Sequence, residues 1–204
     1  MNFKYLFSRK NNRRFLTVIV SVTIIYFIGY LLIGKAFVPD SFTEARRQSA
    51  VVAKEIVSAT GKSIENLDKI ALQDRKYNFS KALSLVHEEL ANTKNARIKA
   101  ADLAKNLSDM AIAAAEITPT KARNLAIEAM SHETALITRL IVYNDILNSL
   151  LQTLEYKFSG DIRSDSEEVQ VLIKNLNEEA KKINELNELF NQKMDKFDEV
   201  VGIK

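Results

Sequence analysis

The sequence has no cysteine and no tryptophan, and it holds only five glycines and two prolines among 204 residues. Without cysteine there are no disulfide frameworks, thiolate nucleophiles or cysteine-ligated zinc sites. So few turn-forming residues argue against a sandwich or barrel of many short strands. The only histidines, His87 and His132, leave little scope for metal clusters or histidine-based triads. Since no nucleotide-binding, zincin or hydrolase motif occurs either, we expect a non-enzymatic protein without catalytic residues, cofactor or metal.

One long apolar run stands out from an otherwise mixed sequence, FLTVIVSVTIIYFIGYLLIG at residues 15–34. A helix of this length covers about 30 Å, the thickness of the hydrocarbon core of a bilayer. Five basic and no acidic residues precede the run, whereas Lys35 alone follows it closely. This asymmetry predicts a cytoplasmic tail at 1–14, a transmembrane signal anchor at 15–38 and an extracytoplasmic domain at 39–204.

A cleaved signal peptide is the alternative, because Gly34 and Ala36 are small residues of the kind that a signal peptidase requires before its cleavage site. The apolar run is longer than the roughly 7–15 residues of a typical signal peptide, so we favour an uncleaved anchor. The prediction is therefore a single-pass protein of the cell membrane that contacts the lipid bilayer through residues 15–38.

The charge of the chain is unevenly distributed. All 26 acidic residues lie from Asp40 onward, so the net charge of +3 comes from the basic N-terminal residues. After residue 39 the two signs are mixed, without the one-sided basic patch that nucleic-acid binding requires. We expect no nucleic-acid partner.

Few residues interrupt the sequence after Pro39, which predicts four long helices. Ser41 and Glu44 match a capping box at the first helix start, and Asn78 is a favourable N-cap for the second. Thr118, which precedes a proline, matches the start of the third helix, and Gly160 favours its end. The predicted ranges are about 42–75, 78–117, 119–158 and 164–201.

Apolar residues recur within each range at alternating steps of four and three. In the last range the pattern begins Val169, Ile173, Leu176, Ala180 and Ile183. Such a pattern is typical of helices that bury one face against neighbouring helices. Helices of this size are about 50–60 Å long, and short connections make neighbours antiparallel. The predicted fold is all-α: an N-terminal transmembrane helix followed by an elongated, antiparallel four-helix bundle that resembles a coiled coil.

The third predicted helix carries apolar residues on more than one face. Ile137 and Ile141 both lie outside its main apolar stripe. A helix that is apolar nearly all round is either central in its own bundle or covered by a partner. Two alternatives stay open: a protein partner or homo-oligomer that binds through these residues, and a wide core stripe in a monomeric bundle.

Three charged residues are candidates for a binding site. Arg97 falls on the apolar stripe of the second helix, Arg139 lies at the same height on the third, and Glu133 falls on the stripe of the third. A buried charge is costly unless it is paired. One hypothesis is a polar layer that binds an anionic ligand. The alternative is that Arg97 extends its head to solvent, or pairs with Glu133 or Asp145.

One N-terminal span followed by four long helices resembles the extracytoplasmic four-helix-bundle sensor modules of bacterial chemoreceptors and sensor kinases. The LemA-type membrane proteins also combine one N-terminal span with long helices. These resemblances are of architecture, without a shared motif, and they assign no family. Those receptors have a second span and a cytoplasmic signalling module, which this sequence does not show after its fourth helix. We therefore expect an envelope scaffold or protein-interaction module, with an accessory sensor or ligand-binding module as the alternative.

Overall fold

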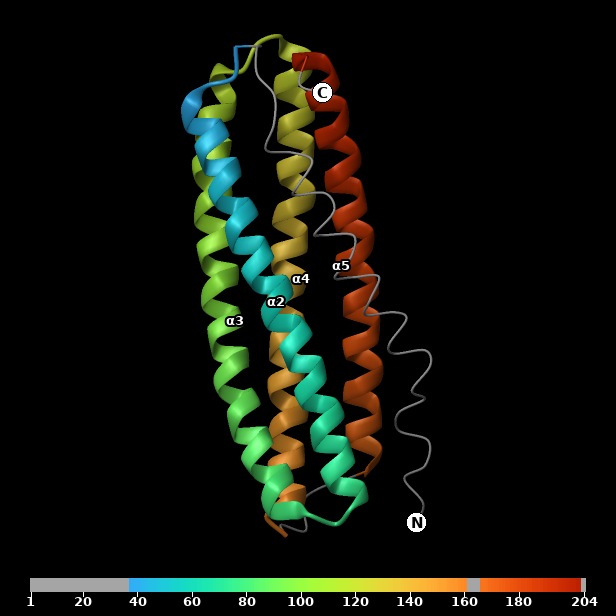
Figure 1. The fold of residues 1–204 in the computed structure, drawn as a ribbon. Helices are drawn as coiled ribbons and strands as arrows, with labels where there is room; N and C mark the ends of the chain where they lie inside the picture. Colours follow the sequence, from blue (N-terminus) through green and yellow to red (C-terminus); the bar gives the residue numbers. More distant parts are fainter. Residues whose placement is uncertain (1–36, 161–165, 203–204) are drawn as a thin grey trace.

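The computed structural model describes residues 37–160 and 166–202, and every element within these ranges is helical. Four long helices and one short 3-10 turn form an elongated antiparallel bundle (Figure 1). The all-helical class and the four predicted helices are therefore confirmed, and the observed helix ends lie within a few residues of the predicted ones. The elements are α2 (Asp40–Arg75), α3 (Phe79–Ala113), η1 (Ala114–Glu116), α4 (Thr120–Phe158) and α5 (Ser166–Val201).

The predicted basic tail and transmembrane anchor lie almost entirely outside the described residues. Within the part of the chain that the structure describes, no helix has the continuous apolar length that a bilayer crossing needs. The transmembrane helix at residues 15–38 accordingly stays a prediction from the sequence.

The helix ends follow the sequence in part. The side chain of Asn78 accepts a hydrogen bond from a backbone N–H in the first turn of α3, as predicted. Gly160 follows the end of α4 with a φ of 80°, a conformation that glycine adopts without steric cost. Thr118 is not a cap, because the chain remains extended through Pro119 and α4 begins only at Thr120.

The capping box predicted at the start of α2 does not form. Pro39 occupies the N-cap position, and no side chain caps the helix. The fixed φ of a proline and the acidic Asp40 in the first turn both suit a helix start. Ser41 therefore lies one residue inside the helix, and Glu44 accepts hydrogen bonds from Arg47 instead of reaching back to the N-cap.

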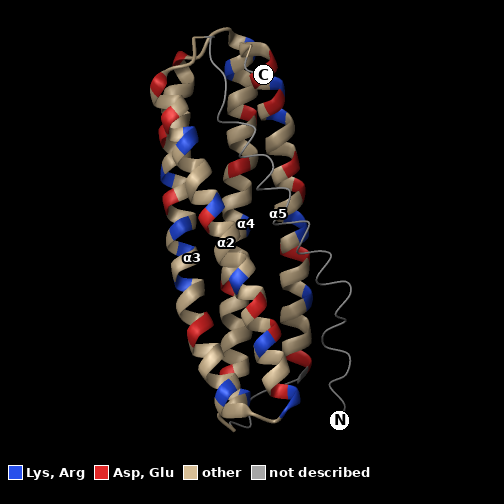
Figure 2. Ribbon diagram, in the orientation of Figure 1, with Lys and Arg blue, Asp and Glu red and all other residues tan. Residues whose placement is uncertain are grey.

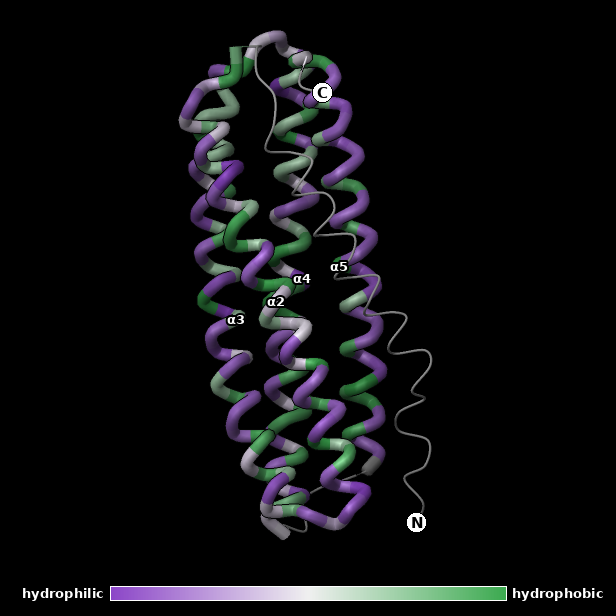
Figure 3. The backbone as a smooth tube through the Cα atoms, viewed as in Figure 1, coloured by the Kyte–Doolittle hydropathy of each residue, from purple (hydrophilic) through white to green (hydrophobic). Residues whose placement is uncertain are grey.

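The core consists of two apolar clusters, one toward each end of the bundle. Along every helix, polar and apolar residues alternate at short intervals, and the apolar ones supply these clusters (Figure 3). The upper cluster lies toward the end where α2 begins, the upper end in Figure 1. Its largest buried members are Phe42, Leu103, Met110, Ile117, Met194 and Phe197. The lower cluster comprises Ile70, Ala82, Val86, Leu147, Leu150, Leu151, Phe158, Val169 and Leu176.

Close packing within the bundle accounts for the wide apolar face of α4, which packs against both α3 and α5. Ile137 is 5% exposed and belongs to the upper cluster, and the half-buried Ile141 packs against the same cluster. Neighbouring helices cover both residues within the bundle, as the alternative of a wide core stripe expects. Whether the bundle binds a partner or a second copy is not tested by this packing.

Side chains join α2 to α5 near the ends of the chain. The rings of Phe42 and Phe197 lie 5.7 Å apart between centroids, and the guanidinium of Arg46 lies 5.6 Å from the centre of the Phe197 ring. The same guanidinium donates two hydrogen bonds of 2.9 Å to the carboxylate of Asp198. Burial raises the pKa of Asp198 to about 6, although the charge of Arg46 opposes this rise. These contacts connect the first and last helices of the bundle.

Candidate functional site

A layer of buried polar side chains separates the two apolar clusters. On each long helix, these residues fall between the last member of one cluster and the first member of the other. Polar groups withdrawn from water are costly unless they find hydrogen-bond partners, so such a layer is a candidate site. Its members are Ser63 and Asn66 of α2, Glu89 and Thr93 of α3, Asn144 of α4 and Glu179 of α5.

Glu89 is the fully buried acid of this polar layer. Its Oε2 accepts a hydrogen bond of 2.9 Å from the amide of Asn66 on α2 and one of 3.0 Å from the amide of Asn92. Its Oε1 is buried and has no hydrogen-bond partner among the described residues. An unsatisfied buried polar atom costs about 1–3 kcal/mol. The polar layer thus contains one acceptor that the bundle leaves without a donor.

Tyr143 of α4 lies close enough to Glu89 to feel its charge. Burial raises the pKa of the Tyr143 hydroxyl to about 12, and the negative charge of Glu89 contributes to the rise. The tyrosine therefore keeps its proton throughout the physiological pH range. This part of the interior presents a carboxylate, amides and a neutral phenol between two apolar clusters.

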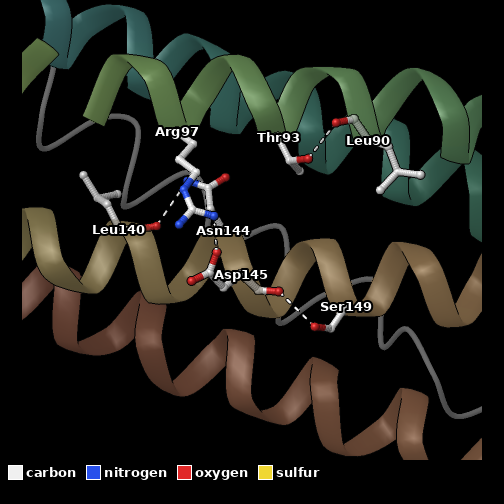
Figure 4. Close-up of polar contacts among 7 residues, drawn as sticks. All are labelled: Leu90, Thr93, Arg97, Leu140, Asn144, Asp145 and Ser149. Atoms are coloured by element: carbon white, nitrogen blue, oxygen red, sulfur yellow. Dashed lines mark hydrogen bonds and ion pairs between the residues drawn. The ribbon is translucent and has the colours of Figure 1, made fainter. Parts of the chain in front are cut away.

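The outer edge of the polar layer between α3 and α4 holds an ion pair (Figure 4). Arg97 Nη1 lies 2.9 Å from Asp145 Oδ1, and both side chains are more than half exposed. The neighbouring Asn144 is buried and donates to the carbonyl of Leu140 at 3.1 Å. Arg97 therefore pairs with Asp145 and at the same time extends its head to solvent, both of which the alternative to a ligand site allowed.

The prediction that Arg97 lies on the buried stripe of its helix is therefore wrong. The buried residues of α3 keep a seven-residue repeat along the helix, with Glu89, Leu103 and Met110 in one set of positions and Val86, Thr93 and Ala100 in the other. Arg97 lies one residue after position 96 of the first set, so its side chain falls outside the buried stripe. The observed stripe in the first half of α3 is Ala82, Val86, Glu89 and Thr93. The steps of four and three between these residues are the pattern that would have identified Glu89.

Arg139 lies on a different interface, between α4 and α5. Its Nη1 is 3.4 Å from Oε2 of the buried Glu179, and Lys182 Nζ is 2.6 Å from Oε1 of the same carboxylate. The hydrogen bond from Lys182, followed by the charges of Lys182 and Arg139, lowers the pKa of Glu179 below its ordinary value. Glu179 is consequently an ionised acid that two cations stabilise.

Glu133 is half-buried on α4 and has no ion pair or side-chain hydrogen bond among the described residues. Met130 and Ile137, which share its face of the helix, both belong to the upper apolar cluster. Burial in these surroundings raises the pKa of Glu133 to about 7. Glu133 is thus an acid that changes its charge near neutral pH.

The structure does not bring the three predicted site residues together. Arg97 pairs across α3 and α4, Arg139 pairs across α4 and α5, and Glu133 lies against apolar neighbours. The hypothesis that they bind an anionic ligand remains a prediction that this arrangement does not test. The sequence analysis missed Glu89 and Asn66, which form the inner hydrogen bond of the polar layer.

The two histidines have different surroundings. His87 Nε2 is 2.8 Å from Glu155 Oε1 on the exposed side of α3 and α4, whereas His132 is half-buried on α4. Within residues 37–160 and 166–202, no group of three or more histidine or acidic side chains is arranged to hold a metal ion.

We expect the substitution Glu133→Gln to stabilise the protein at high pH and to have little effect at low pH. The folded protein holds the Glu133 proton more tightly than the unfolded chain, whose glutamates ionise near the ordinary value of 4.5. The stability that Glu133 contributes is therefore full below about pH 4.5 and declines as the pH rises to about 7. Glutamine does not titrate, so the variant gains on the order of 2 kcal/mol over wild type at about pH 8.

Urea denaturation of the full chain, followed by circular dichroism at several pH values, measures this effect. The matched control is Glu65→Gln, which alters an exposed acid on α2. A stability difference between Glu133→Gln and wild type that does not change with pH would contradict the prediction.

Aromatic side chains gather at the end of the bundle where α2 connects to α3, the lower end in Figure 1. Tyr77 is 81% exposed and lies edge-on to Phe79, with 6.2 Å between ring centroids. Phe79 stacks on Phe158 of α4 at 6.0 Å. Tyr77 also has a φ of 56°, which costs a non-glycine residue about 1–2 kcal/mol. We call Tyr77, Phe79 and Phe158 the aromatic end.

An aromatic end, a polar layer and a half-buried acid are the features that distinguish this bundle from simple helical packing. Function must be inferred from their chemistry and from their positions along the bundle. Comparisons with protein-family models, with curated proteins and with solved structures found no match for this chain.

Proposed function

We propose that the chain is a non-enzymatic, single-pass membrane protein whose bundle is an extracytoplasmic scaffold that binds another protein through its aromatic end. The apolar run at residues 15–34 and the five basic residues before it support the anchor and its orientation. The observation that carries the proposal is the position of the aromatic end, where Tyr77 and Phe79 are exposed. It is the end of the bundle opposite to the one where α2 begins (Figure 1).

The length of α2 sets the distance between these two ends. Its 36 residues correspond to about 54 Å of helix. A chain anchored through residues 15–34 therefore holds Tyr77 about 50 Å from its point of attachment. Aromatic residues are enriched in protein interfaces, where they supply large contact areas. An exposed Tyr77 on a strained connection suits contact with a partner better than it suits a purely structural turn.

The surface charge supports a protein partner rather than a nucleic acid. Lysine, arginine, aspartate and glutamate of both signs are interspersed along all four long helices (Figure 2). Several of them form ion pairs between helices, such as Lys99 with Glu55 and Lys193 with Glu128. A nucleic-acid interface instead requires cations gathered on one face.

The polar layer favours a second candidate function, an accessory sensor or ligand-binding module that acts on another membrane protein. The buried Oε1 of Glu89 has no partner among the described residues and is an acceptor that a small donor molecule would satisfy. In that case a ligand that stabilises the wild-type bundle should not stabilise a Glu89→Leu variant. The scaffold function predicts no such ligand.

Labelling of single cysteines tests the membrane topology, because the chain has no cysteine of its own. Ser84→Cys alters an exposed residue of α3, and Ser8→Cys lies in the basic tail. We expect a membrane-impermeant maleimide to label Ser84→Cys in intact cells and Ser8→Cys only after permeabilisation. Labelling of Ser8→Cys in intact cells would contradict the proposed orientation.

Photo-crosslinking tests the aromatic end. A photoreactive phenylalanine analogue at position 77 should give one discrete adduct in intact membranes, and Phe79→Ser should weaken that adduct. The control is the same analogue at position 98, where an isoleucine is exposed along the side of α3. Equal adduct formation at both positions would show that the aromatic end has no special role.

A further inference from the structure

The opposite end of the bundle also exposes apolar side chains. Phe37 is 70% exposed and Ile112, in the last turn of α3, is 74% exposed. The backbone carbonyl of Phe37 accepts a hydrogen bond of 3.4 Å from the N–H of Thr118, in the connection between α3 and α4. Figure 1 shows this connection beside the start of α2, at the upper end of the bundle. We call Phe37, Ile112 and the connection at 114–119 the attachment end.

The distance from the apolar run to Phe37 is short. Only Lys35 and Ala36 separate residue 34 from Phe37, so the two are at most about 10 Å apart. Beyond the hydrocarbon core, each side of a bilayer has a headgroup layer about 5–8 Å thick. A chain that leaves the bilayer at residue 34 therefore places Phe37 within the headgroup layer or at its outer edge. The hydrogen bond to Thr118 brings the connection between α3 and α4 to the same level.

We propose that the attachment end rests on the bilayer surface, with the side chains of Phe37 and Ile112 inserted into the interfacial layer. This inference rests on the proposed membrane anchor and adds a second contact to it. Two apolar side chains on different segments give the rod two separate points of contact with the bilayer, which limits its tilt. The bundle is thereby held upright, and the aromatic end points away from the membrane.

The polar residues around the attachment end suit an interfacial position. Arg123 donates to the carbonyl of Ala115 at 3.2 Å, and the exposed Lys121 lies in the first turn of α4. Long basic side chains can extend their charged heads to the headgroups while their stems cover apolar surface. Asp40 and Glu116 add negative charge at the same end. Because both signs occur at this end, we expect insertion of the apolar side chains to drive the contact, so that neutral lipid is sufficient.

Single tryptophans test this inference, because the chain has no tryptophan of its own. The full chain is placed in phosphatidylcholine nanodiscs, with and without bromine on the acyl chains. The probes are Phe37→Trp and Ile112→Trp, and the controls are Ile98→Trp on the side of α3 and Tyr77→Trp at the aromatic end. We expect brominated lipid to quench both probes several-fold, with a blue shift of their emission, and to leave both controls unchanged.

A fifth variant separates failure of the inference from failure of the anchor. Tyr26→Trp lies within the apolar run and should be quenched strongly if the run crosses the bilayer. If Tyr26→Trp is quenched but the probes are not, the anchor is supported and the proposed contact of the attachment end with the bilayer is wrong. If Tyr26→Trp is not quenched and the chain elutes apart from the nanodiscs, both the anchor and the inference fail.

Two further outcomes would also overturn the inference. Quenching of Ile98→Trp as strong as that of Ile112→Trp would mean that the rod lies flat on the membrane. A blue shift of both probes without quenching by brominated lipid would mean that protein, such as a second copy of the chain, covers this end.

Discussion

Replacement of Phe197 by alanine is expected to lower the free energy of unfolding by about 3–5 kcal/mol, the usual cost of removing a buried aromatic ring. Phe197 is fully buried in the upper cluster and packs against Phe42 of α2. The ring also lies beneath the guanidinium of Arg46, whose ion pair with Asp198 connects the same two helices. Its loss leaves a cavity at the point where the first and last helices meet.

Urea denaturation of the full chain in mild detergent, followed by circular dichroism, measures this change. The matched control is Leu189→Ala, which shortens an exposed side chain of α5 and should alter stability by less than about 0.5 kcal/mol. Equal effects of the two substitutions would show that the contact between Phe42 and Phe197 does not stabilise the bundle.

Replacement of Glu89 by leucine is expected to cost about 2–4 kcal/mol, although leucine is apolar and the site is buried. The substitution removes the acceptor of the Asn66 Nδ2 group, which then remains buried without a partner, and also that of the half-buried Asn92. The double variant Asn66→Leu, Glu89→Leu removes both partners and joins the two apolar clusters. It should be less destabilised than the Glu89→Leu single variant, because the Nδ2 group of Asn66 is no longer buried without an acceptor.

A double-mutant cycle with the two single variants and the double variant measures this coupling. Glu88→Leu is the matched control, because Glu88 is the exposed neighbour of Glu89 on α3. Its expected effect is within about 0.5 kcal/mol. Strict additivity in the cycle would show that Asn66 and Glu89 stabilise the bundle independently of each other.

Helix number and approximate length were predictable from the sequence because both depend on local properties. Few glycines and prolines, together with repeated steps of four and three, leave long uninterrupted helices as the natural outcome. Asn78 and Gly160 were also predictable, because each acts on backbone groups of its own segment. The prediction that Ser41 caps α2 was wrong, because Pro39 occupies the N-cap position and the helix already begins at Asp40.

An all-helical chain with four long amphipathic helices follows from local sequence properties, since propensity and periodicity operate over neighbouring residues. On α3, the exact side that is buried became clear from the packing against α2 and α4. The seven-residue repeat of buried positions on α3 includes Glu89, whereas Arg97 lies one residue after position 96 of that repeat and is exposed. Ile137 is covered because α3 and α5 both flank α4, which depends on how the helices are arranged in space. Residues distant in the chain, such as Tyr77 and Phe158, share one end only because antiparallel packing brings their helix ends together.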